Sequence, residues 1–244
     1  MNAVRSAGIW FMMIGLIIVW TPLLAIIRWL DRDPIRYRTG RWFRRLGAAM
    51  VAVNPAWKVS VSGAIPDNPR LPYLFVGNHQ SYADIPVVSV LPWDMKWLAK
   101  AELFKLPFLG WMLHWAMDIP VDRESRSSGA KALIQARDLL RKGSSLMIFP
   151  EGTRTADGEI GAFQSASVAL AIKEGVPIVP IVIDGSFDAL PRQSWHFGPP
   201  ATIRVTLLPA VSTTGLTTKN AAELTEQIRR QMQDALAISK KQEG

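Results

Sequence analysis

The chain has 244 residues, of which 49% are hydrophobic, and it contains ten Trp and no Cys. This composition is too apolar for a disordered chain, and the lack of Cys excludes a disulfide framework, a thiolate zinc site, an iron–sulfur cluster and a Cys nucleophile. Residues 1–60 hold nine Lys and Arg against two Asp, a net charge of +7, whereas the rest of the chain has a net charge of only +1, so we expect a membrane partner and no nucleic-acid partner.

The first predicted element is a hydrophobic helix. Residues 8–27 carry no charge, and as a helix they would reach about 30 Å, the thickness of a bilayer core. Arg28, rather than a signal-peptide cleavage site, follows this run. Trp10 and Trp29 lie near its ends, where indole rings favour the membrane interface, and Pro22 is expected to kink the helix. The run therefore predicts membrane association; a buried core helix is the alternative.

The next element is a basic amphipathic helix. Apolar residues recur at helical spacing, and Arg38, Arg41 and Arg45 form a second stripe. Such a helix lies on anionic headgroups. If the hydrophobic run spans the bilayer, the excess of Arg after it places the body on the cytoplasmic face of the cell (inner) membrane. Two helices that span the bilayer and two that dip into one leaflet are both compatible with this pattern. We predict a membrane-associating two-helix segment over residues 1–57 and an α/β domain over residues 58–244.

From residue 58 onward, short β-like runs alternate with helical ones. Alternation of this kind predicts a central α/β sheet covered by helices, with its chemistry in loops beyond the carboxyl ends of the strands. The predicted strands are Lys58–Ser62, Tyr73–Gly77, Met95–Ala99, Met117–Val121, Ser145–Phe149, Ile178–Ile183 and Ala201–Leu208. Helices are predicted near residues 81–91, 102–115, 128–142, 162–174 and 220–238.

The chain lacks the signatures of several enzyme classes. It has no G-x-S-x-G, G-x-x-x-x-G-K-[ST], G-x-G-x-x-G or H-E-x-x-H motif, so Ser hydrolases, P-loop NTPases, dinucleotide enzymes and zincins are not indicated. Of its three His, His114 has apolar neighbours and is predicted to pack, and His196 is predicted to lie in a loop. His79 remains as the candidate for chemistry.

His79 belongs to the segment Asn78-His79-Gln80-Ser81-Tyr82-Ala83-Asp84, which follows a predicted strand. With Ser81 as the N-cap of the next helix, Asp84 would lie in the first turn and reach Nδ1 of His79. Asp84 would then fix the tautomer and leave Nε2 free to accept a proton. A His–Asp pair without a Ser or Cys nucleophile points to activation of a hydroxyl that belongs to the substrate. A His in a capping loop is the structural alternative.

A second motif follows the predicted strand at residues 145–149. In Pro150-Glu151-Gly152-Thr153-Arg154, Gly152 permits a sharp turn or close approach of a ligand, and Thr153 offers a hydroxyl. The Arg154 side chain is a planar donor suited to a phosphate. Glu151 is acidic, and we assign it to positioning of the loop. A surface loop with one Arg is the alternative.

Together the two motifs resemble those of the glycerolipid acyltransferases, specifically the 1-acylglycerol-3-phosphate (lysophosphatidic acid) acyltransferases. Three further segments are similar to blocks of that family, in the same order, and the hydrophobic front end is similar to that of bacterial members. These segments are Lys100-Ala101-Glu102-Leu103, Ile119-Pro120-Val121-Asp122-Arg123 and Val176-Pro177-Ile178-Val179-Pro180.

The resemblance implies a specific reaction. His79, oriented by Asp84, would deprotonate the free hydroxyl of a lysophospholipid, which would attack the thioester of acyl-CoA or acyl-carrier protein and give phosphatidic acid. Lys100, Arg123 and Arg154 would bind the acceptor phosphate, and a backbone N–H near Gly152 would stabilise the oxyanion. The partners would be membrane lipids, the lysophospholipid and the acyl donor, and the chemistry requires no metal or nucleotide cofactor.

The chain departs from the family pattern after the second motif. The family usually has Phe-Lys-x-Gly there, whereas this chain has Phe163-Gln164-Ser165-Ala166. The missing cation leaves open another acceptor, such as lyso-ornithine lipid. A membrane-surface module that binds anionic lipid without catalysis is the non-enzyme alternative.

Overall fold

Within residues 2–122 and 125–241, which the computed structural model describes, the centre of the protein is a seven-stranded sheet. Its order is β1-β7-β6-β2-β5-β3-β4, and neighbouring strands are parallel except for β6 and β7. The strands are β1 (Trp57–Gly63), β2 (Leu74–Gly77), β3 (Met95–Lys100), β4 (Ile119–Val121), β5 (Ser145–Ile148), β6 (Ile178–Asp184) and β7 (Ala201–Leu207). All seven predicted strands are present within two residues at each end, which confirms the α/β sheet.

The helices are α1 (Asn2–Leu30), α2 (Tyr37–Ala52), α3 (Asp84–Val88), α4 (Leu109–Trp115), α5 (Arg126–Arg141), α6 (Ala166–Glu174), α7 (Ser186–Ala189) and α8 (Ala221–Lys241). Two short 3-10 turns are η1 (Ala101–Lys105) and η2 (Thr218–Asn220). The helix predicted over residues 102–115 divides into η1 and α4, because Pro107 lacks an N–H and Phe108 has a positive φ of 61°. Helix α7 was not predicted, since four residues carry no readable periodicity.

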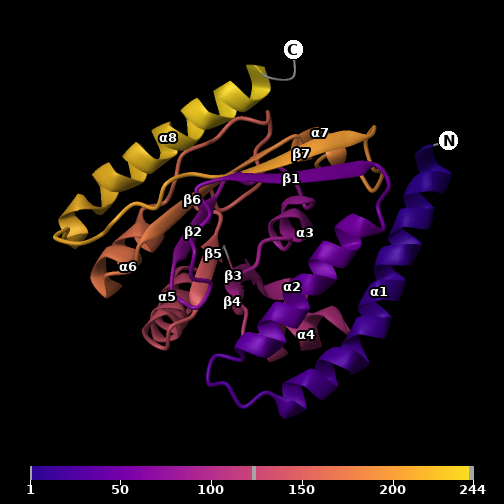
Figure 1. Cartoon of the computed structure of the whole chain (residues 1–244), viewed down its shortest axis with the longest axis horizontal. Helices are drawn as coiled ribbons and strands as arrows, with labels where there is room; N and C mark the ends of the chain where they lie inside the picture. Colours follow the sequence, from indigo (N-terminus) through magenta and orange to yellow (C-terminus); the bar gives the residue numbers. More distant parts are fainter. Residues whose placement is uncertain (1, 123–124, 242–244) are drawn as a thin grey trace.

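Helices cover both faces of the sheet. Strand β2 shows the alternation: Leu74 and Val76 pack with α5, α6 and α8, whereas Phe75 packs on the opposite side with α3 and part of α1. In Figure 1 the sheet accordingly lies between α5, α6 and α8 on one side and α1 to α4 on the other. Every residue of β2, β5 and β6 is buried, as expected for central parallel strands.

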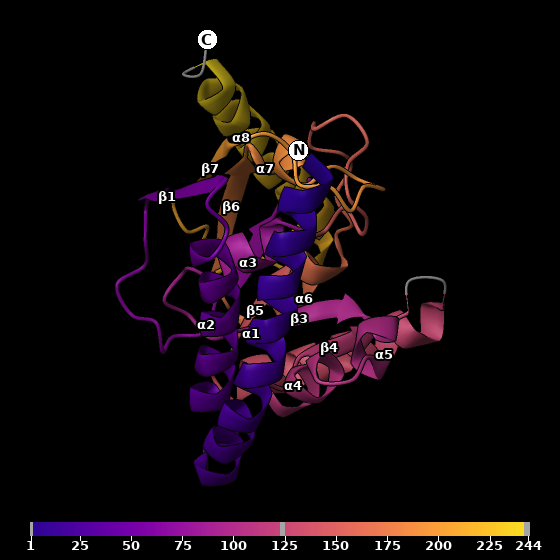
Figure 2. The same ribbon diagram turned by 90° about the vertical axis from the view of Figure 1, so that its right-hand side faces the viewer.

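Helix α1 lies against the body. It continues without interruption through Pro22, and Figure 2 shows it running beside α2. Its inner face contributes Ile9 and Met13 to the core on the sheet and Leu24 to a cluster with α2 and α4. By length and composition alone, residues 3–30 could cross a membrane, although 22% of the most apolar window is buried in the protein.

The outer face of α1 exposes a stripe of large apolar residues. This outer stripe consists of Val4, Phe11, Met12, Ile14, Ile18, Val19, Leu23, Ile26, Trp29 and Leu30. Trp29 therefore faces outward, with 79% of its surface exposed. Trp10 differs: its Nε1 donates to the Trp195 carbonyl at 2.7 Å and its ring contacts Phe197. Trp10 therefore lies on the side of the helix that faces the body and is half-buried there.

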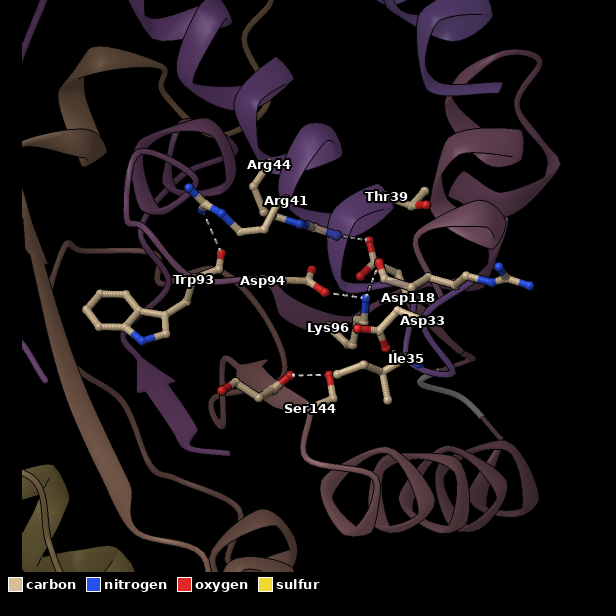
Figure 3. Close-up of polar contacts among 12 residues, drawn as sticks. Asp33, Ile35, Thr39, Arg41, Arg44, Trp93, Asp94, Lys96, Asp118 and Ser144 are labelled. Atoms are coloured by element: carbon tan, nitrogen blue, oxygen red, sulfur yellow. Dashed lines mark hydrogen bonds and ion pairs between the residues drawn. The ribbon is translucent and has the colours of Figure 1, made fainter. Parts of the chain in front are cut away.

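Helix α2 is fixed to the sheet by buried polar contacts (Figure 3). The Arg44 guanidinium is 2.5 Å from Oδ2 of Asp118 in a pair that is almost fully buried. Arg41 was predicted to face lipid headgroups, but it donates to the carbonyls of Leu91 and Trp93 at 3.0 and 3.2 Å. Arg38 and Arg45 are exposed, as the amphipathic pattern predicts.

Candidate active site

The candidate site forms where β2 and β5, adjacent parallel strands, end at the same edge of the sheet. The chain leaves β2 at Gly77, and Asn78 then anchors the following loop to β6. Its side-chain amide donates to the Ile183 carbonyl at 2.9 Å and accepts from the Ile183 N–H at 2.8 Å. This pair replaces backbone ladder bonds at the end of the strand, so the loop from residue 78 to 83 starts from a fixed point.

The structure brings His79 and Asp84 together as the spacing predicts. Nδ1 of His79 lies 2.8 Å from Oδ2 of Asp84, and both side chains are buried, at 6% and 0% exposure. Because the carboxylate accepts, Nδ1 carries the proton of the neutral imidazole and Nε2 presents a lone pair. Within the residues that the structure describes, Nε2 has no hydrogen-bond partner. The pair thus has the arrangement of a general base and its orienting carboxylate.

The Asp84 carboxylate is held by three further donors. The N–H groups of Gln80 and Ser81 donate to Oδ2 at 2.8 and 2.9 Å, and the Ser186 hydroxyl donates to Oδ1 at 2.5 Å. Ser81 is not the N-cap that the sequence suggested: α3 begins at Asp84 with Ala83 at the cap position. The Ser81 hydroxyl accepts from the Ala83 N–H at 3.1 Å, within the turn before α3, and donates to the Leu190 carbonyl at the end of α7 at 2.7 Å.

Glu151 connects the second motif to the first. Its Oε1 accepts from the His79 N–H at 2.8 Å, and its Oε2 accepts from the Gly161 N–H at 3.3 Å. On the other side, the Thr155 N–H donates to the His79 carbonyl at 2.8 Å. Burial raises the pKa of Glu151, while the His79 and Gly161 N–H groups oppose the shift. Glu151 therefore occupies the loop-positioning place that the sequence suggested, with His79 itself as the object it holds.

An apolar cleft adjoins the dyad. Phe149 stacks on the His79 imidazole with ring centroids 4.2 Å apart and an angle of 13° between the ring planes, and the same ring lines the cleft. The cleft has a volume of about 860 Å³. Its apolar wall comes from the ends of β3, β4 and β5 and from α5, and includes Leu98, Val121, Leu133 and Ile148. The base therefore lies beside a space suited to an apolar chain.

The predicted cations are not gathered in the described cleft wall. Lys100 is exposed and pairs with Glu102 at 3.1 Å. The Arg154 guanidinium lies over the Tyr82 ring, 3.7 Å from its centroid. Arg123 falls outside the described residues. Gly152 and Thr153 line the cleft.

Gly152 has a positive φ of 72°, which favours glycine. Its N–H donates to the Phe149 carbonyl at 3.1 Å, so this N–H is engaged within the turn. Gln164, one of the residues that depart from the family pattern, lies next to Gly152. Gln164 and Ala166 both line the cleft, and Nε2 of Gln164 is 2.9 Å from the place where a Cβ on Gly152 would stand. A neutral amide therefore borders the second motif.

Among residues 2–122 and 125–241, no group of three His, Asp or Glu side chains is placed to hold a metal ion. The described cleft wall carries two ionisable side chains, Asp122 and Glu151, both acidic. The site therefore offers a base, a carboxylate and an apolar space, with neutral polar groups at the turn.

Comparison with known proteins agrees with this geometry. Residues 58–184 match the family model for the acyltransferase domain. The chain is 34% identical to the lyso-ornithine lipid O-acyltransferase of Pseudomonas aeruginosa over 78% of its own length and 70% of that protein. The chain belongs to the acyltransferase family.

Other relatives in the family carry the name that the motifs suggested. The 1-acyl-sn-glycerol-3-phosphate acyltransferase of Pseudomonas aeruginosa is 28% identical over 97% of this chain and 91% of that protein. The crystal structure of the LPA acyltransferase PlsC from Thermotoga maritima superposes with a TM-score of 0.83 at 25% identity, covering 98% of this chain and 96% of that one. By contrast, the chain spans about half the length of the chloroplastic LPAT1 of Arabidopsis thaliana, at 31% identity over 75% of this chain and 50% of that protein.

Sequence reasoning missed the two polar residues behind the dyad. Ser186 contacts Asp84, and Gln80 donates to the Gly158 carbonyl at 3.0 Å. Gln80 lies inside the first motif, but Ser186 is 102 positions from Asp84. Only the position of β6 beside β2 brings Ser186 to the site, and the strand order cannot be deduced from the sequence pattern alone.

Proposed function

We propose that this chain transfers a fatty acyl group from acyl-CoA or acyl-carrier protein to the free hydroxyl of 1-acylglycerol-3-phosphate, which gives phosphatidic acid. The observation that carries this proposal is the His79–Asp84 pair at the end of β2, with Nδ1 engaged and Nε2 directed away from Asp84. The family supplies the reaction class, and the names of full-length relatives supply the acceptor.

In the proposed reaction, Nε2 of His79 accepts the proton of the acceptor hydroxyl while that oxygen attacks the thioester carbonyl. A C–O bond forms, and collapse of the tetrahedral intermediate breaks the C–S bond. The imidazolium then returns the proton to the leaving thiolate, and Asp84 stabilises the positive charge in between. The Ser hydroxyl near the dyad donates to Asp84 and not to His79, so an acyl-enzyme is not part of the proposal.

The apolar cleft is the proposed place of an acyl chain, because its wall beside Phe149 is made of aliphatic side chains. For the acceptor phosphate we propose Arg154, in the loop after β5, and Lys100, the last residue of β3, together with Arg123. Both described cations are partly accessible, and an arriving phosphate would compete with Tyr82 and Glu102 for them.

A second acceptor has its own support. Gln164 stands where the family usually has a cation, and the charged side chains of the described cleft wall are acidic. A relative with 34% identity is named a lyso-ornithine lipid O-acyltransferase. A lyso-aminolipid, whose headgroup carries an amine, is therefore the alternative acceptor.

The test is an acyl-transfer assay of the purified full-length protein in detergent micelles. The acceptors are 1-acylglycerol-3-phosphate and lyso-ornithine lipid, each offered with acyl-CoA and with acyl-carrier protein. We expect transfer to 1-acylglycerol-3-phosphate, and loss of at least 99% of it in His79→Ala. His196→Ala, which removes an exposed imidazole, is the matched control and should retain activity. Transfer to lyso-ornithine lipid alone would establish the alternative acceptor, and an active His79→Ala would refute the mechanism.

We also propose that the protein lies on the cytoplasmic face of the cell membrane, with α1 in the plane of one leaflet. The inner face of α1 is buried against the body at both ends of the helix, while the outer stripe is apolar over most of its length. A helix held in this way can insert its outer face without crossing the bilayer.

Substitution within the outer stripe tests the membrane proposal. The triple variant Phe11→Ser/Ile18→Ser/Trp29→Ser removes three exposed side chains, and we expect its binding to anionic lipid vesicles to fall about tenfold or more in a flotation assay. Ile65, Ile134 and Ile238 are exposed apolar residues elsewhere, at 46%, 51% and 60%, and their triple Ser variant is the control. Equal binding by both variants would place the membrane contact outside the outer stripe.

A further inference from the structure

Ser186 lies directly behind the catalytic pair. It is the first residue of α7 and is completely buried, and its Oγ is 2.5 Å from Oδ1 of Asp84. The other carboxylate oxygen, Oδ2, faces Nδ1 of His79 at 2.8 Å. The three groups therefore form a line from a hydroxyl through a carboxylate to an imidazole.

The chain turns sharply to place this hydroxyl. Gly185 follows β6 with a φ of 82°, and a Cβ at this position would overlap the Thr202 carbonyl. Only glycine adopts this conformation without strain and also fits against β7. Because Asn78 fixes β6 beside β2 through Ile183, the residue after the turn faces the loop that carries the dyad.

The hydroxyl has one proton and two acceptors within reach. Oδ1 of Asp84 lies at 2.5 Å and is charged, whereas Oε1 of Gln80 lies at 3.2 Å and is neutral. The proton therefore goes to the carboxylate, since charge-assisted hydrogen bonds are shorter and stronger. Among the described residues, Ser186 is the donor to Oδ1, while Oδ2 is shared by three N–H groups.

We propose that Ser186 is a positioning residue that fixes the rotation of the Asp84 carboxylate, so that Oδ2 stays in line with Nδ1 of His79. This inference rests on the proposed role of His79 as the base. With the hydroxyl removed, Oδ1 is buried without a donor, and the carboxylate can rotate or carry more charge at Oδ2. Rotation lowers the rate, because the imidazole loses its orientation.

The same change alters the pH dependence. Where Oδ2 still faces Nδ1, a carboxylate with one donor fewer stabilises the protonated imidazole more strongly. A larger fraction of the enzyme is then protonated at His79, and therefore inactive, at a given acidic pH. The charged groups next to His79 in the described structure are Asp84 from α3, which contacts the imidazole, and Glu151 from the loop after β5, which accepts from the His79 backbone N–H. Because Ser186→Ala changes a contact of Asp84 and none of the contacts of Glu151, a shift of the pH profile in this variant would arise from Asp84.

The experiment compares full-length variants in the acyl-transfer assay. We expect Ser186→Ala to lower kcat about tenfold with KM values for both substrates within about twofold, and to move the acid limb of kcat/KM upward by about half a pH unit. Ser89→Ala is the matched control, because this buried hydroxyl in the turn after α3 donates to the Ile85 carbonyl and not to the Asp84 carboxylate. Its kcat and pH profile should equal those of the wild type.

A second pair keeps the test independent of folding. Ser186→Thr and Ser186→Val have nearly the same volume and differ in the hydroxyl, so whatever the added methyl costs is common to both. The Thr variant should be about fivefold or more faster than the Val variant. Equal rates for this pair, or a Ser186→Ala enzyme with the kcat and pH profile of Ser89→Ala, would overturn the inference while an inactive His79→Ala still supports the base. An active His79→Ala would overturn both.

Discussion

Two buried aspartates, Asp84 and Asp94, differ in the number of hydrogen bonds that their carboxylates accept. Asp84 receives four hydrogen bonds, from one imidazole, two backbone N–H groups and one hydroxyl. Asp94 has Nζ of Lys96 at 2.5 Å from its Oδ2, and its Oδ1 has no hydrogen-bond partner in the part of the chain that the structure describes. Both carboxyls are nearly inaccessible to water, at 0% and 3% exposure.

The difference follows from what each carboxylate holds in place. The donors to Asp84 come from its own loop and from α7, so they surround the group that orients His79. Asp94 lies instead under α2 (Figure 3), where Gly40 allows close approach because a Cβ would overlap the carboxylate. Burial raises the pKa of Asp94 to about 6, although Lys96 and Arg44 oppose the shift. In the proposed reaction the network around Asp84 thus serves chemistry, whereas the network around Asp94 attaches α2 to the sheet.

Replacement of the charge at Asp84 should have the larger effect. In Asp84→Asn the amide oxygen can still accept from His79, and the amide N–H₂ can donate to the Ser186 hydroxyl, so the packing is retained. The negative charge that stabilises the imidazolium is lost, and we expect kcat/KM for acyl transfer to fall about a thousandfold with little change of Tm. Steady-state kinetics and a thermal melt in the same detergent measure the two quantities.

Asp94→Asn is the matched control, because it makes the same chemical change at the other buried aspartate. Its kcat/KM should stay within about threefold of the wild type, since the described contacts of Asp94 are with α2 and Lys96 rather than with the cleft. A loss of activity as large as that of Asp84→Asn would show that the two networks are coupled and would remove the distinction drawn between them.

The dyad and the Asp94 network also differ in how far the sequence predicts them. His79 and Asp84 are five positions apart, at the junction of a strand and a helix, and this short spacing was enough to predict their contact. Arg44 and Asp118 are separated by 74 positions, and their pairing depends on how α2 crosses the sheet. No local pattern predicts such a crossing, so Arg41 was interpreted as part of the basic stripe and the pairing of Arg44 was missed.

Helix α1 shows the same limit on one element. Its length and apolar character were evident in the sequence, but a helix that is apolar on all sides does not reveal which face meets the body. Trp10 and Trp29 both lie near the ends of the apolar run and cannot be told apart from the sequence. In the structure, Trp10 donates to the Trp195 carbonyl, whereas Trp29 is exposed. The strands were predictable because their apolar runs are short and bounded by turn residues, which is a local property.

Asp94 should also make the stability of the protein depend on pH. Its carboxyl has a folded-state pKa of about 6 against an ordinary value of 3.8, so the folded protein binds a proton more tightly than the unfolded chain. The resulting stability is fully present below pH 3.8 and is lost as the pH rises through about 6. Across this range the free energy of unfolding of the wild type should fall by roughly 3 kcal/mol because of this carboxyl, and Asp94→Asn should show no such loss.

Urea unfolding of both full-length proteins, followed by Trp fluorescence at pH 4, 5, 6 and 7, measures this difference. Other carboxyls raise or lower both curves together, because they are common to the two proteins, so the free energy of unfolding of the wild type minus that of the variant isolates Asp94. This quantity should decrease steadily from pH 4 to pH 7. A constant difference would mean that Lys96 and Arg44 compensate for burial completely, and Asp94 would then be as well solvated by its cations as Asp84 is by its donors.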